Sequence, residues 1–355
     1  MAATPMRATP SISTCGDPMS ASDSLPPIEI GLSAAIVAVE GDRPEILVVD
    51  FAGAPPGLPF GPFDPLRHRT LEIGLRAWVE AQTALTLGYV EQLYTFGDRG
   101  RHARRDDRGP HEVSVGYLAL TRPPAEAQGA VRGTEALFVP WYDFFPWEDW
   151  RGEDGRGQRP ALLDEAILPD LRAWAGEKPT SHEAFRGLPR RERLRLCFGE
   201  DGMPWDEERA LERYELLYEA GLVEEAARDG RDAALKRRAG GSAPPTLGRS
   251  MQADNRRILA TAISRLRAKL KYRPVVFEMM PESFTLTELQ RTVEAISGHH
   301  VHKQNFRRLV ENSAMVEPTG GSTLKTGGRP AQLFRFRREV LQERPAPGLR
   351  LSGRG

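Results

Sequence analysis

Apolar and polar positions near the N-terminus are arranged in short runs that predict β-strands. Ile28 to Val39 reads IEIGLSAAIVAV, and after the turn residues Gly41 and Asp42 the segment Glu45 to Phe51 reads EILVVDF. Runs rich in β-branched residues that end at Gly, Asp or Pro are typical of strands. Three further strands are predicted over residues 89–96, 113–120 and 136–140.

Between these strands one segment changes to a helical period. Over Leu71 to Leu85 the apolar residues fall roughly on one side of a helix, at Leu71, Leu75, Trp78, Val79 and Leu85. A helix among several strands indicates an α/β domain, which we place at residues 28–145. Residues 1–27, rich in Pro, Ser, Thr and Ala, are expected to be a disordered tail.

Residues 146–250 have a different character and are expected to form a helical insert. Helical periods cover residues 162–175, 190–198 and 207–228, and the segment 240–248, GGSAPPTLG, has the composition of a linker. A new helix with Asp254 as its N-cap is predicted over residues 254–271. It opens a C-terminal domain placed at 251–340, followed by a disordered tail at 341–355.

The C-terminal domain carries the pattern of a helix-turn-helix with a wing. Thr285 and Glu288 form a predicted capping box for a helix that runs to Ser297 and stops at Gly298. A second helix follows over residues 303–312, with Phe306 facing the core. A strand, a Gly-rich basic loop over residues 319–330 and a returning strand over 331–337 complete the wing. This order of elements suits duplex DNA.

The side chains that could contact DNA lie on the second helix and in the loop. Arg pairs with guanine, and Gln or Asn with adenine, while Lys and Arg also neutralise phosphates. The predicted DNA-binding residues are Lys303, Gln304, Asn305, Arg307, Arg308, Lys325 and Arg329. Winged helices also serve protein–protein contacts, so a structural or protein-binding role stays open. The loop's Leu-Lys-Thr resembles the end of a P-loop, but both required glycines are absent.

Charge is divided unequally along the chain. The 355 residues carry 49 Lys+Arg and 49 Asp+Glu, yet from Met251 onward there are 19 basic and 9 acidic residues. Such a split favours a polyanionic partner for the C-terminal part. The two cysteines, Cys15 and Cys197, provide neither a disulfide framework nor a zinc ligand set. The absence of a signal or membrane segment leads us to expect a cytoplasmic protein without membrane contact.

The first domain resembles the Nudix layout of strand, strand, Gly-Pro loop and charged helix. A working Nudix box contains an Arg-Glu and a Glu-Glu pair, and the Glu-Glu pair and the earlier Glu hold Mg²⁺ on a pyrophosphate. Aligned on LPFGPFDPLRHRTLEIGLRAWVEAQTAL, those pairs fall on Ala77-Trp78 and Ala81-Gln82. Glu72, Arg76 and Glu80 lie nearby but out of register. They form one stripe at a spacing of four residues, either a surface ion ladder or the rim of a ligand pocket.

Both ends together resemble the NrtR-type family, Nudix-related transcriptional regulators of NAD metabolism. The resemblance is carried by LYTFGDRG and DRGPHEVSVGYLAL in the first domain, and more strongly by PESFTLTELQRTVEAISGHHVHKQNFRRLVENSAMVEPTG and GGRPAQLFRF. It covers residues 28–140 and 254–337. It implies a Nudix-like α/β sandwich, a helical insert and a C-terminal winged helix-turn-helix.

The same resemblance implies a regulator, expected to be a homodimer, that binds double-stranded DNA and an ADP-ribose or NAD-related nucleotide effector. No cofactor, metal or catalytic residue is expected, because the degenerate box lacks carboxylates. Candidate effector contacts are Glu72, Arg76, Glu80, Arg99 and Arg108, the last two in an Arg-rich loop, where Arg101 is a further candidate. The alternatives are a Mg²⁺-dependent Nudix pyrophosphohydrolase with an unusual box and a ligand-controlled protein-interaction module.

Two clusters are open to ordinary explanations. His299, His300 and His302 lie on one turn, but no matching ligands follow nearby, so a solvated turn or a phosphate contact is favoured over a metal site. The aromatic residues between Trp141 and Trp150 lie where the first domain meets the insert. We expect them to pack the insert against the first domain.

Overall fold

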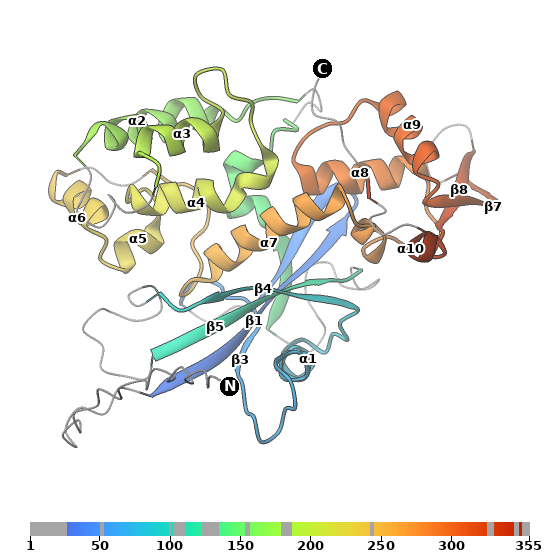
Figure 1. Cartoon of the computed structure of the whole chain (residues 1–355), viewed down its shortest axis with the longest axis horizontal. Coiled ribbons are helices and arrows are strands. Elements are labelled where there is room, and N and C mark those ends of the chain that lie inside the picture. Colours follow the sequence, from blue (N-terminus) through green and yellow to red (C-terminus); the bar gives the residue numbers. More distant parts are fainter. Residues whose placement is uncertain are drawn as a thin grey trace, which may run out of the picture.

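A computed structural model describes most of the chain between residues 27 and 349. The described ranges are 27–49, 53–98, 101, 111–122, 135–152, 157–178, 187–241, 245–324, 330–343 and 348–349. Figure 1 shows a twisted sheet below, a group of short helices above it, and a small helical head with a hairpin at one end. Among the helices of the described ranges, none has the length and apolarity needed to cross a bilayer.

The sheet has six strands in the order β4-β5-β1-β2-β6, with β3 paired to the first part of β1. Its strands are β1 (Ile28–Glu40), β2 (Arg43–Val49), β3 (Phe60–Pro62), β4 (Tyr89–Phe96), β5 (His111–Leu120) and β6 (Ala136–Pro140). Only the pair of β1 and β5 is parallel. The five predicted strands are confirmed, and β3 is an addition that the sequence pattern did not indicate.

Both faces of the sheet are covered, because alternate residues of β1 belong to two different cores. Leu32, Ala34 and Ile36 pack with Leu75 and Val79 of α1 (Leu71–Thr83), on one face. The next residues along, among them Ala35 and Val37, pack toward α7 (Asn255–Leu270) on the other. Figure 1 shows α1 and α7 on opposite sides of the strands. The first unit is therefore a three-layer α/β sandwich.

Helix α7 was placed by its sequence in the C-terminal domain, but it packs against β1, β4 and β5 as well as against the head. Ile258, Leu259, Ile263 and Leu266 are fully or almost fully buried in this position. The helix thus belongs to the sandwich as its second helical layer. The segment 240–248, predicted to be a linker, includes the buried residue Leu247, and Met251 between this segment and α7 is also buried.

The insert consists of short helices above α7. They are α2 (Leu168–Gly176), which continues from one π-helical turn at Leu163–Ile167, α3 (Arg190–Phe198), α4 (Ala210–Glu219), α5 (Glu224–Arg228) and α6 (Asp232–Ala239). The single helix expected over residues 207–228 is wrong. It breaks at Gly221, whose φ is +71° and where a Cβ would lie 2.4 Å from the backbone nitrogen of Ala234.

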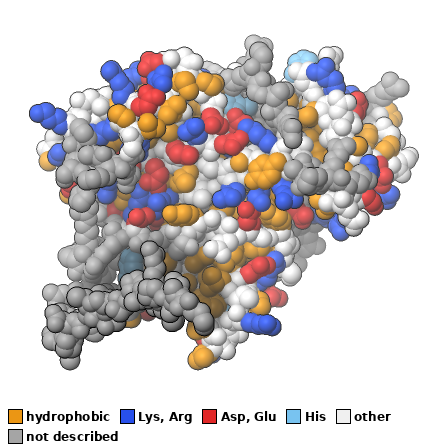
Figure 2. Space-filling view, viewed as in Figure 1, with side chains coloured by type: hydrophobic (Ala, Val, Ile, Leu, Met, Phe, Trp, Pro, Cys, Tyr) orange, Lys and Arg blue, Asp and Glu red, His pale blue; other side chains and the backbone are white. Residues whose placement is uncertain are grey.

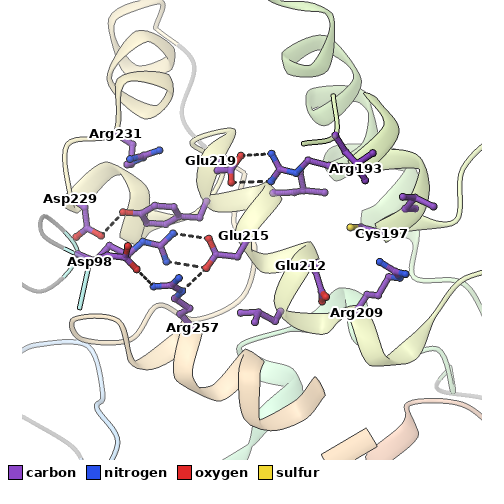
Figure 3. A pocket seen from close by; sticks show the side chains of 16 residues that line it. Asp98, Arg193, Cys197, Arg209, Glu212, Glu215, Glu219, Asp229, Arg231 and Arg257 are labelled. Atoms are coloured by element: carbon purple, nitrogen blue, oxygen red, sulfur yellow. Dashed lines mark hydrogen bonds and ion pairs between the residues drawn. The ribbon is translucent and has the colours of Figure 1, made fainter. Parts of the chain in front are cut away.

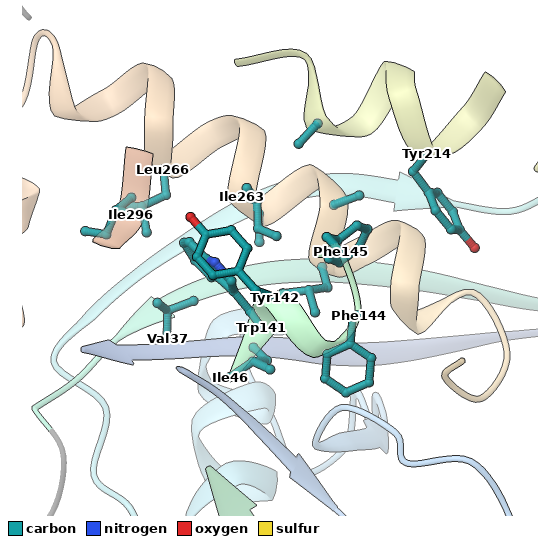
Figure 4. Close-up of a cluster of buried hydrophobic side chains, with 14 of the residues drawn as sticks. Val37, Ile46, Trp141, Tyr142, Phe144, Phe145, Tyr214, Ile263, Leu266 and Ile296 are labelled. Carbon is teal, nitrogen blue, oxygen red and sulfur yellow. The ribbon is translucent and has the colours of Figure 1, made fainter. Parts of the chain in front are cut away.

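An aromatic segment joins the insert to the sandwich, as expected. Trp141, Phe144, Phe145 and Trp147 are fully buried. Phe145 meets Tyr214 of α4 edge to face, with ring centroids 6.1 Å apart. Figure 4 shows Trp141 and Tyr142 between the sheet and α7, with Phe145 directed toward α7. One continuous apolar core therefore runs from the sheet through α7 to the insert and the head.

The described part of the C-terminal head contains two helices and a hairpin in the predicted order, followed by a short third helix. Its elements are α8 (Leu286–Ser297), α9 (Lys303–Ser313), β7 (Val316–Thr323), β8 (Ala331–Phe336) and the short α10 (Val340–Glu343). Phe284, ahead of α8, exchanges two backbone hydrogen bonds with Phe334 of β8, at 3.0 and 2.8 Å. That bridge fixes the hairpin beside α8, which is the layout of a winged helix.

Two expectations about the head differ from the structure. The loop expected over residues 319–330 is shorter, because β7 continues to Thr323 through a register shift that Gly320 permits with a φ of +80°. The tail expected to be disordered from residue 341 includes part of α10. Beyond it Leu349 is buried, and its backbone N–H donates to the carbonyl of Leu270. The predicted disorder of residues 1–26 falls outside the described residues.

Candidate nucleic-acid interface and effector surface

Helix α9 presents one apolar side to the head and one polar side to solvent. Phe306 and Val310 are buried, which anchors the helix on α8 and the hairpin. The opposite side carries the five residues that the sequence singled out, and all of them are exposed: Lys303, Gln304, Asn305, Arg307 and Arg308. Figure 2 shows Lys or Arg and His side chains at the edge where Figure 1 places α9. Side chains so placed can reach base edges in a groove.

The first helix of the head begins and ends as its sequence predicts. Thr285 Oγ1 accepts a hydrogen bond from the backbone N–H of Glu288. The Glu288 carboxylate in turn accepts from the backbone N–H of Thr285 at 2.6 Å. At the other end Gly298 has a φ of +75°. A Cβ there would lie 2.3 Å from the carbonyl oxygen of Glu148, so glycine is required for close packing as well as for the turn.

The last turn of α8 is bonded to the sandwich rather than to water. The carbonyls at a helix C-terminus have no partners within the helix. Here Ala295 O accepts from the Tyr142 hydroxyl at 2.7 Å, and Ile296 O from Arg267 Nε at 2.9 Å. Gly298 O accepts from the Trp150 N–H at 2.8 Å. These bonds hold the head in one orientation on the core.

Three buried charged side chains lie next to the contact between the head and the sandwich. Glu148 is fully buried and bonds both Arg213 of α4 and Arg267 of α7, each through contacts of 2.6 Å. Burial by itself raises the pKa of Glu148, but the two guanidinium groups outweigh it and hold the pKa below its usual range. Sequence reasoning missed this group, because the three residues are far apart in the chain and no local pattern links them.

The sequence of the head matches a known family of domains. Residues 276–336 match the family model described as the NrtR DNA-binding winged helix domain. The C-terminal head has the NrtR winged helix fold. The match begins after α7, which agrees with the position of α7 on the sandwich.

Similarity to individual proteins extends the comparison. A curated protein of Acinetobacter baylyi, named ADPR responsive transcriptional repressor NtrR, is 45% identical over 83 residues. That alignment covers 23% of this chain and only 33% of the relative, so the chain matches about a third of that protein's length.

Solved structures resemble the chain over a much longer stretch. The crystal structure of Shewanella oneidensis NrtR complexed with a 27mer DNA covers 88% of this chain and 95% of its own, with a TM-score of 0.50 and 20% identity. A second crystal structure of Shewanella oneidensis NrtR gives a TM-score of 0.50 at 19% identity over the same shares. These similarities establish the fold, a Nudix-like sandwich followed by the NrtR-type head.

The predicted effector stripe lies on α1, on the face of the sheet away from the insert (Figure 1). Arg76 bonds Glu72 at 2.9 Å and also donates to the carbonyls of Leu87 and Gly88, at 2.5 and 3.1 Å. The bond to Glu72 belongs to a surface ion ladder along the helix. The two bonds to carbonyls attach the helix to the loop at residues 87–88. Glu80 is exposed one turn further along the helix.

The positions aligned with the carboxylates of a Nudix box carry other chemistry. The Gln82 amide makes two hydrogen bonds to the backbone of Phe60 in β3. Its oxygen accepts from the Phe60 N–H at 3.2 Å, and its nitrogen donates to the Phe60 carbonyl at 2.5 Å. Trp78 lies against Gly61, where a Cβ would be 2.2 Å from the indole, and its Nε1 donates to Pro62 O at 2.8 Å. Both side chains therefore fasten α1 to β3. Within the described residues no three His, Cys, Asp or Glu side chains gather as a metal site.

The remaining candidates are only partly described. Arg99, Arg108, Lys325 and Arg329 lie outside the described residues. Arg101 is described, and it bonds Glu215 of α4 at 2.7 Å and stacks on the ring of Tyr218 at 3.9 Å. Arg101 therefore faces the insert and not α1.

The histidine turn has structural partners of its own. The His300 ring lies 3.0 Å from Glu294 and 3.1 Å from the carbonyl of Arg151. His299 lies against the Trp150 ring, with centroids 5.3 Å apart. His302 is exposed at the start of α9. Two of the three histidines thus pack the turn between α8 and α9 against the core.

Proposed function

We propose that the protein is a DNA-binding transcription regulator that responds to an ADP-ribose-like or NAD-derived nucleotide. The observation that carries the proposal is α9, which projects Lys303, Gln304, Asn305, Arg307 and Arg308 to solvent from an NrtR-type winged helix. In a helix-turn-helix the second helix enters the major groove, where Arg, Gln and Asn side chains distinguish base pairs. The loop residues Lys325 and Arg329 would add phosphate contacts.

Support for the effector comes from a relative's name and from the sandwich itself. The Acinetobacter protein is named as ADPR responsive, and the fold of the first unit matches that of Shewanella NrtR. We propose that the effector binds on the α1 side, with Glu80 and Glu72 at its rim. Arg99 and Arg108, which lie outside the described residues, stay candidate contacts for its anionic groups. Arg76 is the least available of the set, because its guanidinium already serves Glu72 and two carbonyls.

We infer that the sandwich senses the nucleotide and does not hydrolyse it. Mg²⁺ in such a site is held by carboxylate oxygens, and the positions aligned with those carboxylates carry Trp78, Ala81 and Gln82 instead. The Gln82 amide is engaged with Phe60 at both its oxygen and its nitrogen. A homodimer in the cytoplasm is part of the proposal, because a two-fold protein matches two half-sites on a duplex.

A selection from a random duplex pool tests the proposal. The full chain is incubated with the pool, bound duplexes are sequenced, and the experiment is repeated with ADP-ribose and with NAD. We expect enrichment of one motif with two related half-sites and a changed yield of bound duplex with one nucleotide. Recovery of unselected sequence in all three conditions would contradict the proposal and favour a protein-binding role for the head.

A further inference from the structure

A cavity of about 650 Å³ lies in the insert, on the opposite face of the sheet from α1. It is lined by α3 and α4, by the turn between α5 and α6, and by Asp98 and Arg101 beyond β4. Figure 3 shows Arg231 on one side of this cavity, with Cys197 and Arg209 on the other. Its volume is that of a site for a small organic molecule.

Most of the charged groups in the cavity wall are already neutralised by one another. Glu215 bonds both Arg101 and Arg257, at 2.7 and 2.6 Å. Glu219 receives two parallel bonds from Arg193, at 2.8 and 2.9 Å. Charged pairs that satisfy each other have little attraction left for a ligand.

The acid near Arg231 is also engaged. Asp229 accepts from the Tyr218 hydroxyl at 2.9 Å and lies 3.5 Å from Arg228. Burial raises the pKa of Asp229, and the bonds from Tyr218 and Arg228 oppose that effect. Asp229 thus has its own hydroxyl and guanidinium partners within the wall.

Arg231 is different from the other basic groups of the wall. It is half-buried and lines the cavity, and its guanidinium makes no ion pair or hydrogen bond with the described residues. Its guanidinium lies 5.4 Å from the centre of the Tyr218 ring. The guanidinium of Arg101 lies 3.9 Å from the centre of the same ring. A half-buried cation with no carboxylate partner, in a cavity, is a docking point for an anionic group.

Leucines provide the rest of the surface. Leu196, Leu211 and Leu216 line the wall, and Leu188 stands at its rim with half of its area exposed. Leu216 has no exposed area, so the apolar surface open to a ligand comes from Leu188 and from the half-buried Leu196 and Leu211. The carboxylate of Glu212 also lines the cavity without an ion-pair partner among the described residues, but it lies on the Cys197 side, away from Arg231 (Figure 3). An apolar wall beside Arg231 therefore suits a molecule that has a hydrophobic body and a single acidic group at the Arg231 end.

We propose that this cavity is a second ligand site, separate from the nucleotide sensor, for a small organic anion with an apolar or aromatic body. Its carboxylate, sulfonate or phosphate group pairs with Arg231, and its body lies against Leu188, Leu196 and Leu211. The site belongs to the insert, so it goes beyond the nucleotide response proposed above.

The test uses anilinonaphthalene sulfonate, an aromatic sulfonate whose fluorescence rises in an apolar site, with the full-length protein. Titrations compare the wild type with Arg231→Ala and Leu188→Ser. Both side chains are at least partly exposed and make no hydrogen bond or ion pair with described residues, so these variants should fold. Matched controls are Arg238→Ala and Leu235→Ser on α6, which are exposed and lie outside the cavity lining.

We expect one saturable site in the wild type. Loss of one charge-assisted bond should raise its Kd about tenfold or more in Arg231→Ala. The Leu188→Ser variant should bind the probe a few fold more weakly, and the controls should match the wild type. ADP-ribose should leave the fluorescence signal unchanged. An Arg231→Ala Kd within about twofold of the wild type would overturn the site. Displacement of the probe by ADP-ribose would overturn its separateness. Neither readout involves DNA, so either result is independent of the regulator proposal.

Discussion

Arg213 on α4 and Glu148 in the aromatic segment are joined by two hydrogen bonds, of 2.6 and 2.8 Å, and neither side chain has any exposed area. Arg267 completes the group with a 2.6 Å bond to the same carboxylate. Arg267 also bonds Ile296 at the end of α8. One buried carboxylate therefore connects the insert, the second helical layer of the sandwich and the first helix of the head.

Replacing Glu148 by Gln should destabilise the protein strongly. The substitution keeps the shape but leaves two buried guanidinium groups without their counter-charge, which costs about 3–5 kcal/mol in comparable cases. Chemical denaturation of the full chain measures the effect. The control is Glu40→Gln, which breaks the exposed pair with Arg43 and should cost less than about 1 kcal/mol. Equal losses in the two variants would show that the buried group contributes no more than a surface pair.

The same carboxylate gives a pH dependence with a defined sign. The folded protein holds the pKa of Glu148 below its ordinary value of 4.5. The stabilisation is therefore complete at neutral pH and is lost as the pH falls through and below 4.5. In denaturation series between neutral and acidic pH, the Glu148→Gln variant should show a shallower acid-side loss of stability than the wild type. Parallel curves would contradict this assignment.

The Nudix-like sandwich should show no Mg²⁺-dependent turnover. Without the carboxylates of a working box, wild-type protein incubated with ADP-ribose and Mg²⁺ should release no AMP above the uncatalysed level in a chromatographic assay. The Glu80→Gln variant should behave identically. Turnover that requires Mg²⁺ and disappears in Glu80→Gln would identify the protein as a hydrolase with an unusual box.

Cys197 should be a slow thiol in the native protein. Burial and nearby Glu212 raise its pKa to about 11, against the opposing effect of Arg213, so the reactive thiolate is scarce at neutral pH. In a Cys15→Ser background, iodoacetamide labelling of Cys197, followed by mass spectrometry, should be much slower in native than in denaturant-unfolded protein. Equal rates in the two states would contradict both the burial of Cys197 and the raised pKa of its thiol.

The sequence predicted those features that depend on neighbours along the chain. The capping box of Thr285 and Glu288, the stop at Gly298 and the two faces of α9 follow from local hydrogen bonds and a period of 3.6 residues. Strand β3 has only three residues and no period to recognise. The break at Gly221 depends on the close approach of α6, and the Glu148 group and the cavity depend on residues far apart in sequence. Such contacts leave no local pattern.

Lys325→Ala should affect phosphate binding and leave base reading unchanged. Lys325→Ala should weaken binding to every duplex alike and reduce the slope of log K against log salt by about 0.9, as expected for one lost phosphate contact. Fluorescence anisotropy at several salt concentrations measures both quantities. A Lys325→Ala protein with an unchanged salt slope would remove this loop residue from the interface.

The most direct measurement is the sequence preference of the Arg308→Ala protein in a random duplex pool, beside the wild type and a control, Arg191→Ala, in which an exposed arginine of α3 is removed. If α9 lies in the major groove, Arg308→Ala should lose discrimination at one base position per half-site, by about 1–3 kcal/mol, and keep the rest of the motif. The control should reproduce the wild-type motif. An Arg308→Ala motif identical to that of the wild type, at equal affinity, would contradict the assignment of α9 as the helix that reads DNA.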